Sequence, residues 1–314
     1  MVSYGKFKRQ NFKGGALLRG YIPYKRIVKP LRLPRLSVEI GFGNGEFLVS
    51  LAKRHPERYF LGIELSGISV EKLLKRLREE GLRNVFCVRL DAYWAFYLLL
   101  SDEAVEAIYL NYPDPWFKKR HHRRRLTRPE NLYLFARRLK TGGEILLRTD
   151  DRPFLEYTLE SAGEVAAFEV SWEVLSPASP LTKYEAKWMA QGKTLYAARL
   201  RKVRPPKEIP HPQIEEVSAV FPVTVKDLSR LSELSGKTLR PREDLVLKIF
   251  RLWEHGEDRL IEVLLSEAGY LQRFMIFARR VPGGWRLDVS GFSEVLRTRG
   301  LKEALEFLAR ELNP

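Results

Sequence analysis

The sequence is poor in cysteine and in long apolar runs. Cys87 is the single cysteine among 314 residues, so an internal disulfide is excluded and a reducing compartment such as the cytoplasm is expected. The run WAFYLLL at residues 94–100 is among the longest apolar stretches, far below the roughly 18 residues of a membrane span. The N-terminus lacks the apolar core of a secretion signal, although its Arg-rich character leaves a transit peptide as an alternative. We therefore expect a cytoplasmic protein without a membrane anchor.

Acidic side chains are missing from one end of the chain. Residues 1–35 contain ten Lys and Arg and no Asp or Glu. The whole net charge of +16 lies in residues 1–204, because residues 205–314 contain 17 basic and 17 acidic side chains. A charge cluster this one-sided usually meets a polyanion. A solvated basic surface is the alternative, and membrane phosphates are less favoured because no amphipathic helix accompanies the charge.

Prolines mark a boundary in the second half of the chain. The stretch RKVRPPKEIPHPQ at residues 201–213 contains four prolines and can propagate neither a helix nor a central strand. We expect a domain at residues 1–204, which includes the basic N-terminal arm, and a second at 205–314. Two domains agree with the length of the chain.

Strand and helix patterns alternate before this boundary. Buried-strand patterns occur five times, at residues 36–40, 59–63, 84–90, 105–110 and 144–149. One helix is expected to open at Gly45-Glu46 and another to run from Ser66 to Gly81. Thr127 and Glu130 form a capping-box pattern for a helix ending at residues 141–143. The alternation predicts an α/β fold with a parallel, doubly wound sheet, which binds ligands at the carboxyl ends of its strands.

The second domain has a different pattern. Four strand-like segments follow one another, at residues 245–253, 259–267, 273–281 and 285–289. A turn at 282–284 joins the last two, and a helix is expected from about residue 293 to 312. This pattern predicts a small α+β module containing an antiparallel meander. The sequence does not indicate its role.

A glycine loop follows the first predicted strand. Gly41, Gly43 and Gly45 have the spacing G-x-G-x-G and allow a tight turn and a close approach to a ligand. The dinucleotide fingerprint G-x-G-x-x-G would need a glycine where Glu46 stands, and this carboxylate would repel a pyrophosphate. With Glu39 just ahead of it, the loop favours a ligand that is positively charged and carries no phosphate.

Two further acids end the next two strands. Glu64 lies 19 residues after Gly45, where a carboxylate can accept both hydroxyls of a ribose. Asp91 follows the third strand, where it could accept from an adenine amino group. Each acid alone has a simpler interpretation as a polar loop residue. Three acids at three successive strand ends, beside the glycines, predict a pocket for an adenosine that bears a cation, which describes S-adenosyl-L-methionine.

The fourth strand leads into YLNYPDPWFKKRHHRRRL at residues 109–126. Pro113 and Pro115 restrict the backbone on both sides of Asp114, so its carboxylate is presented with little freedom. Seven basic side chains follow, namely Lys118, Lys119, Arg120, Arg123, Arg124, Arg125 and Arg128. A rigid turn with Trp116 as a core residue is the alternative. The basic run favours a site that draws phosphates toward the carboxylate.

These motifs resemble, in order, those of the bacterial tRNA (guanine-N7-)-methyltransferases. The resemblance covers about residues 36–200 and rests on VEIGFGNGEF, GIE, DA, YPDPWFKKRHHRRRL, RTDD and PLTKYE. It implies a Rossmann-like class I methyltransferase sheet and methyl transfer from S-adenosyl-L-methionine to a variable-loop guanosine of tRNA, at tRNA position 46. The implied cofactor-binding residues are Glu39, Gly41, Gly43, Gly45, Glu64, Asp91 and Asp114, and Asp114 is also the implied catalytic residue. The implied substrate-binding residues are Lys118, Asp150, Thr182, Lys183, Tyr184 and Glu185.

Residues 205–314 lie outside the resemblance, and several alternatives stay open. Asp114 could contact the guanine, the cofactor or both. An exocyclic-amine N-methyltransferase would use a similar pocket, and an RNA-binding protein without activity would keep the basic run. A dehydrogenase is disfavoured by Glu46. His121 and His122 suit phosphate contacts better than a metal site, so we expect no metal. The sequence leaves the oligomeric state open, with a monomer slightly favoured.

Overall fold

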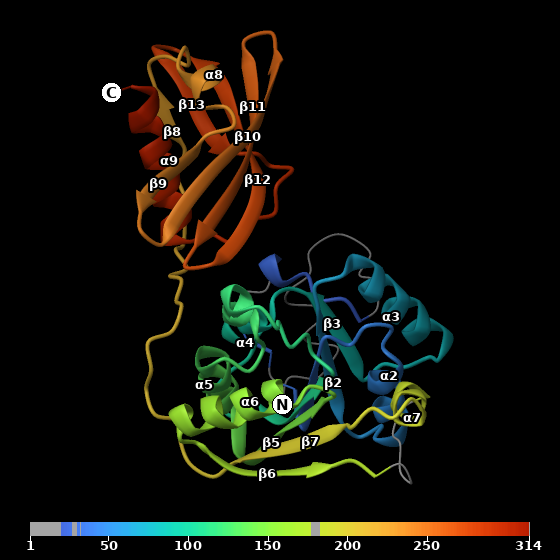
Figure 1. Cartoon of the computed structure of the whole chain (residues 1–314). Coiled ribbons are helices and arrows are strands. Elements are labelled where there is room, and N and C mark those ends of the chain that lie inside the picture. Colours follow the sequence, from blue (N-terminus) through green and yellow to red (C-terminus); the bar gives the residue numbers. More distant parts are fainter. Residues whose placement is uncertain (1–19, 27–29, 32, 177–182, 314) are drawn as a thin grey trace. The chain divides into compact units, whose positions relative to one another are not determined.

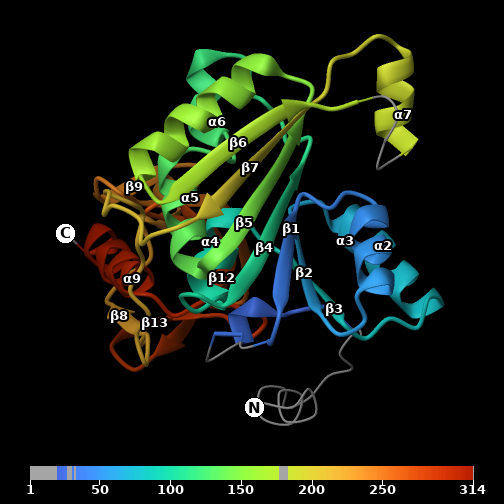
Figure 2. The same cartoon turned by 90° about the horizontal axis from the view of Figure 1, so that it is seen from below.

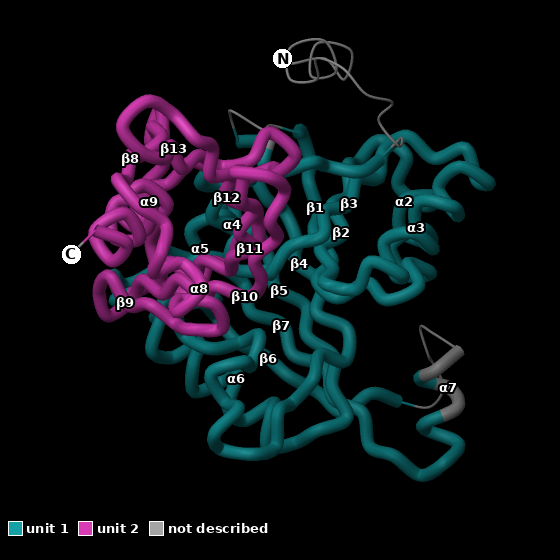
Figure 3. Tube along the Cα trace, turned by 90° about the horizontal axis from the view of Figure 1, so that it is seen from above, with its two compact units in different colours: residues 1–210 teal, residues 211–314 magenta. Residues whose placement is uncertain are grey.

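The computed structural model describes residues 20–26, 30–31, 33–176 and 183–313. Most of the basic N-terminal arm and Thr182 lie outside these residues. The chain divides into two compact units, residues 1–210 and 211–314 (Figure 3). Among the helices of the described residues, none combines the length and the apolar character needed to cross a membrane.

Unit 1 is built on a seven-stranded sheet with the order β3-β2-β1-β4-β5-β7-β6 (Figure 1). Its strands are β1 (Leu36–Ile40), β2 (Tyr59–Glu64), β3 (Val85–Arg89), β4 (Val105–Asn111), β5 (Leu139–Thr149), β6 (Phe168–Val174) and β7 (Tyr196–Lys202). The first five pair in parallel, which confirms the five predicted strands. Strands β7 and β6 add an antiparallel edge to this parallel sheet, and these two strands were not predicted from the sequence.

Helices cover both faces of this sheet. The helices on its faces are α2 (Glu46–Arg54), α3 (Gly67–Glu79), α4 (Ala92–Leu99), α5 (Pro129–Arg138) and α6 (Arg152–Val165). Unit 1 also contains α7 (Lys183–Ala190) and two short 3-10 helices, η1 (Tyr24–Arg26) and η2 (Lys119–Arg124). Helices α2 and α3 lie on one face, and α4, α5 and α6 lie together on the other (Figure 2). This is the two-sided arrangement that the alternating pattern predicted. It leaves the carboxyl ends of β1, β2, β4 and β5 at one edge of the sheet.

Local sequence determines some helix ends but not others. The Ser66 hydroxyl caps α3 by accepting from the backbone N–H of Ser69 at 3.3 Å, which agrees with the helix start predicted at Ser66. The capping box at Thr127 is wrong. Helix α5 starts at Pro129 without a side-chain cap, because the buried Thr127 hydroxyl pairs with the Thr158 hydroxyl at 2.8 Å. The helix also ends earlier than expected, at Arg138.

Unit 2 is a six-stranded antiparallel sheet with the order β8-β13-β12-β11-β10-β9. Its elements are β8 (Val223–Val225), α8 (Leu231–Leu234), β9 (Thr238–Arg242), β10 (Leu245–His255), β11 (Asp258–Glu267), β12 (Tyr270–Val281), β13 (Gly284–Val289) and α9 (Arg299–Leu312). The predicted meander is confirmed as β10 to β13. The final helix starts at Arg299 and not near residue 293, since the Thr298 hydroxyl caps it.

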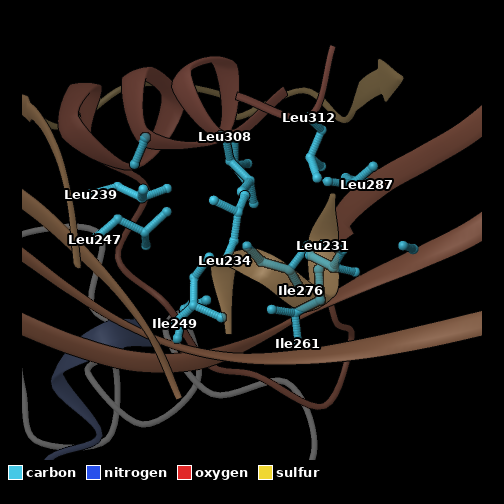
Figure 4. Close-up of a cluster of buried hydrophobic side chains, with 14 of the residues drawn as sticks. Leu231, Leu234, Leu239, Leu247, Ile249, Ile261, Ile276, Leu287, Leu308 and Leu312 are labelled. Carbon is cyan, nitrogen blue, oxygen red and sulfur yellow. The ribbon is translucent and has the colours of Figure 1, made fainter. Parts of the chain in front are cut away.

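The unit 2 sheet curves as a half-barrel around its own core. Leu308 of α9 points toward Leu234 of α8, and Leu312 lies beside Leu287 of the sheet (Figure 4). The buried members of this cluster all lie between Val225 and Leu312. Unit 2 therefore has a hydrophobic core made from its own residues.

Candidate active site

The glycine loop lies at the carboxyl edge of the unit 1 sheet, between β1 and α2. The Gly41 N–H donates to the Ile63 carbonyl at 2.8 Å, and the Gly43 N–H donates to Oε2 of Glu64 at 3.1 Å. Both glycines have positive φ, 73° and 54°, which other residues rarely adopt. A Cβ at either position would meet nothing within 4 Å, so the loop exposes bare backbone to open space. A ligand can approach the main chain there.

Glu39 is a buried carboxylate beside this loop, and its side chain is 2% exposed. Its Oε1 accepts from the Asn111 amide at 3.0 Å, whereas its Oε2 has no hydrogen-bond partner among the described residues. Burial, with a smaller contribution from the charge of Glu64, raises the pKa of Glu39 to about 7. A cation placed nearby would favour its ionised form. Asn111, at the end of β4, was not predicted from the sequence.

Glu64 and Asp91 are both bound into the surrounding backbone. The Glu64 Oε1 accepts from the N–H groups of Leu65 and Ser66 at 2.7 and 3.1 Å, so its carboxylate has a fixed direction. Asp91 caps α4, with its Oδ1 accepting from Tyr93 and Trp94 at 2.9 and 3.5 Å. Its exposed position leaves Asp91 accessible to a ligand. These acids end neighbouring strands, as the sequence predicted.

These residues fit S-adenosyl-L-methionine. Its sulfonium and amino groups are cationic, and Glu39 offers a buried carboxylate oxygen that lacks a partner among the described residues. Its adenosine has hydroxyl and amino donors, which suit the carboxylates of Glu64 and Asp91. Within the described ranges, no group of three His, Cys, Asp or Glu residues is placed to hold a metal ion.

Asp114 lies on a strained turn after β4. Tyr112 and Trp116, on either side of the Pro-Asp-Pro triplet, both have a φ of 51°. A left-handed residue other than glycine costs about 1–3 kcal/mol and persists only where its surroundings impose it. Asp114 itself is exposed. The prolines in the sequence predicted a rigid turn, but they did not indicate these two left-handed residues.

Contacts on both sides hold the turn in place. The Tyr112 N–H donates to the Arg148 carbonyl at 2.8 Å, and Nε of Arg125 donates to the Pro115 carbonyl at 2.9 Å. The Arg124 guanidinium lies 5.0 Å from the centre of the Trp116 ring, a cation–π contact. The turn therefore has a defined shape although it contains no regular structure.

The basic run divides into two groups. Five of its cations are exposed, namely Lys118, Lys119, Arg120, Arg123 and Arg124. Arg125 is instead 6% exposed and lies 4.4 Å from the Tyr157 ring, and Arg128 donates to the Asn131 side chain and the Arg123 carbonyl. The sequence did not distinguish these structural arginines from the others. His121, which accepts from Arg120 and packs on Trp116, also supports the local fold.

Glu185 and Asp150 are the two remaining predicted residues whose side chains are described, on α7 and just after β5. Glu185, only 1% exposed, accepts through Oε1 from the Tyr112 hydroxyl at 2.7 Å and from Nη1 of Arg148 at 2.8 Å. Burial and this hydrogen bond raise the pKa of Tyr112. Asp150 pairs with Lys193 at 2.7 Å. Only the backbone of Lys183 and Tyr184 is described, at the start of α7, and Thr182 lies outside the described residues.

The chain is similar to enzymes of one kind along most of its length. Residues 34–198 match the family described as putative methyltransferase. A tRNA (guanine-N(7)-)-methyltransferase of Aquifex aeolicus is 52% identical over 294 residues, which are 93% of this chain and 99% of that protein. A tRNA (guanine-N(7)-)-methyltransferase of Thermotoga maritima is 32% identical and covers 90% of each chain. Among solved structures, the 16S rRNA methyltransferase KamB is 16% identical, with a TM-score of 0.43 over 64% of this chain and 94% of that one.

Proposed function

The chain belongs to the tRNA (guanine-N(7)-)-methyltransferase family, and on this basis we propose which of its residues transfer a methyl group from S-adenosyl-L-methionine to N7 of a guanosine in tRNA. The target we propose is the variable-loop guanosine at tRNA position 46, which the motif resemblance implies. A tRNA substrate also suits the cytoplasmic location expected from the sequence. The observation that carries the proposal is the exposed Asp114 carboxylate, which lies on a strained turn. This turn follows β4, and β4 pairs with β1, the strand that leads into the glycine loop. The exposed cations of the basic run come directly after the turn.

We assign the methyl donor to the carboxyl ends of β1, β2 and β3. The residues proposed to hold it are Glu39, Gly41, Gly43, Gly45, Glu64 and Asp91. When bound, the donor supplies an electrophilic methyl group: the N7 lone pair forms the new bond, the carbon–sulfur bond breaks, and the positive charge passes from sulfur to the guanine ring. Glu39 stabilises the bound cationic donor electrostatically, because it has a carboxylate oxygen that lacks a partner among the described residues. Glu64 orients the glycine loop through Gly43.

The acceptor atom determines what the protein must provide. Guanine N7 has a free lone pair and no proton, so the reaction needs no general base. It needs alignment of N7 with the methyl group, and negative potential near a ring that becomes cationic. Asp114 supplies both if it accepts from guanine N1–H and N2–H. Direct contact of Asp114 with the donor is the alternative role.

The RNA backbone meets the exposed cations in this proposal. Lys118 and the other four exposed cations of the basic run bind phosphates and set the register, while the carboxylate reads the base. Asp150, Thr182, Lys183 and Tyr184 are proposed to contact the substrate, with Tyr184 stacking on a base. Asp150 would then exchange its ion pair with Lys193 for a contact with the RNA.

The test is incubation of the purified protein with labelled S-adenosyl-L-methionine and unmodified tRNA, followed by nucleoside analysis. We expect N7-methylguanosine, lost when the guanosine at position 46 is replaced by adenosine. N2-methylguanosine would indicate an exocyclic-amine methyltransferase. Tight tRNA binding without any product would indicate an RNA-binding protein that has lost activity.

A further inference from the structure

We propose that Glu185 is a positioning residue, which holds Tyr112 in the left-handed conformation that presents Asp114 to the guanine. This inference rests on the proposed function, because it concerns the same carboxylate. It also gives Glu185 a different role from the substrate contact that the motif resemblance implies.

Three residues form a closed set of hydrogen bonds around the turn. The Tyr112 N–H donates to the Arg148 carbonyl at 2.8 Å, and the Tyr112 hydroxyl donates to Oε1 of Glu185 at 2.7 Å. The Arg148 guanidinium donates to the same Glu185 oxygen at 2.8 Å. Both the backbone and the side chain of Tyr112 are therefore fixed. The backbone is bonded directly to Arg148 near the end of β5, and the side chain is connected to Arg148 through Glu185.

Burial separates Glu185 from the RNA. Its side chain is 1% exposed, whereas Asp114 is exposed and Asp150 keeps about a third of its side chain accessible. A buried carboxylate is tolerated when its charge is compensated and its oxygen is hydrogen-bonded, which Arg148 and Tyr112 accomplish. Reading a base would require Glu185 to break these bonds first.

Tyr112 needs these hydrogen bonds because its backbone conformation is unfavourable for two reasons. A φ of 51° places a residue with a Cβ in the left-handed region. Tyr112 also precedes Pro113, and the proline ring favours an extended conformation in the residue before it. Without the bonds to Glu185 and Arg148, Tyr112 is expected to relax toward the extended region, and the direction of Asp114, two residues later, changes with it.

The neighbouring ring contact adds to the same arrangement. Trp188, one turn after Glu185 on α7, lies edge to face with Tyr112, their ring centres 4.8 Å apart. Lys183 and Tyr184 start this helix. Glu185 thus connects the segment proposed to bind substrate with the turn that carries the catalytic carboxylate.

The experiment is a double-mutant cycle of Tyr112→Phe and Glu185→Gln in the full chain. Tyr112→Phe removes the hydroxyl but keeps the ring against Trp188. We expect each single variant to lower kcat roughly 10- to 100-fold, as a misplaced catalytic group does, while KM for tRNA and the Kd of S-adenosyl-L-methionine stay within about threefold. The double variant should be no slower than the slower single variant, because both changes break one connection.

Tyr133→Phe is the matched control. The Tyr133 hydroxyl also donates to a glutamate, Glu208, elsewhere in unit 1, so this variant removes the same group from a bond that does not involve the turn. We expect its kcat to be unchanged. Thermal unfolding of every variant separates a loss of turnover from a loss of folded protein, and Tyr112→Phe alone tests the proposal if Glu185→Gln does not fold.

Two outcomes would overturn the inference. A Glu185→Gln variant that raises KM for tRNA while Tyr112→Phe remains fully active would assign Glu185 to direct substrate contact. Additive losses in the double variant would show that the two side chains act independently. Failure of the proposed function is distinguishable from both, because the wild-type protein would then form no N7-methylguanosine.

Discussion

At the scale of single residues, we expect the protonation of Glu39 to depend on whether the methyl donor is bound. Burial raises its pKa from the ordinary 4.5 to about 7, so between these values the folded protein keeps a proton that the unfolded chain releases. The contribution of Glu39 to the free energy of unfolding is therefore complete below about pH 4.5 and is lost as the pH rises toward 7. A cationic donor favours the ionised carboxylate.

We expect donor affinity to increase about tenfold between pH 6 and pH 8, as the ionised fraction of Glu39 rises. Calorimetry at these pH values measures the Kd. In buffers of different ionisation enthalpy, it also measures the proton released on binding near pH 7. Glu39→Gln should flatten the part of the pH dependence that comes from this group. An identical pH profile in this variant would show that Glu39 does not titrate on binding.

Asp114→Asn tests the carboxylate that we propose to be catalytic. The substitution removes the charge and keeps the shape, so we expect kcat to fall about 10²- to 10³-fold, the usual effect of losing one electrostatic contact to the transition state. The tRNA Kd should change little, since phosphate contacts dominate affinity. Single-turnover rates and filter binding measure the two quantities. Unchanged turnover with weakened donor binding would assign Asp114 to the donor instead.

The four acidic residues that the sequence predicted for the donor and catalytic sites share one property: they lie at or just after the end of a strand. The carboxyl ends of parallel strands meet at one edge, so the order of the strands and acids along the chain is enough to predict that Glu39, Glu64, Asp91 and Asp114 lie near one another. The bond from Asn111 to Glu39 could not be predicted, because the two lie 72 positions apart and meet only through strand pairing. The left-handed φ of Tyr112 likewise depends on tertiary contacts.

At the scale of elements, the apolar pattern of the sequence predicted an element where its burial is periodic or continuous. The buried face of α3 follows helical spacing, at Val70, Leu73, Leu74 and Leu77, and β1 is buried at every position. Strand β6 was missed because it is an edge strand exposed along almost its whole length. The capping box at Thr127 failed for a tertiary reason, since Thr158 of α6 takes its hydroxyl.

The exposed cations and the structural arginines of the basic run, in and around η2, are expected to respond differently to substitution. Replacing Lys118, Lys119, Arg120 and Arg123 with Gln should weaken tRNA binding and lower the salt slope of log K by nearly one for each phosphate that is no longer neutralised. Arg125→Gln is the control. It removes a buried side chain that contacts Pro115 and Tyr157, so it should lower Tm and leave the salt slope unchanged. Equal slopes for the fourfold variant and wild type would place these cations away from the RNA.

At the scale of the whole molecule, charge and core are distributed differently between the two units. The excess charge of +16 lies before residue 205, whereas residues 205–314 are neutral. Unit 2 nevertheless has its own buried core. Counterion release scales with the phosphates neutralised, so a neutral unit supplies little of that contribution to tRNA affinity. Every residue proposed for donor or substrate binding lies in unit 1.

A chain that ends after Pro210 should therefore fold and methylate guanine N7. The end must lie there and not at residue 204, because the Lys207 N–H donates to the Val165 carbonyl at 2.9 Å and Glu208 accepts from Tyr133. Ending the chain at Arg204 would remove both hydrogen bonds, so it should unfold at a lower temperature than the chain ending after Pro210. We expect kcat of the longer truncation to stay within about threefold of the full chain, with any reduction appearing in affinity for tRNA or in Tm. A truncated protein that is soluble and binds S-adenosyl-L-methionine but transfers no methyl group to saturating tRNA would show that unit 2 takes part in the chemical step.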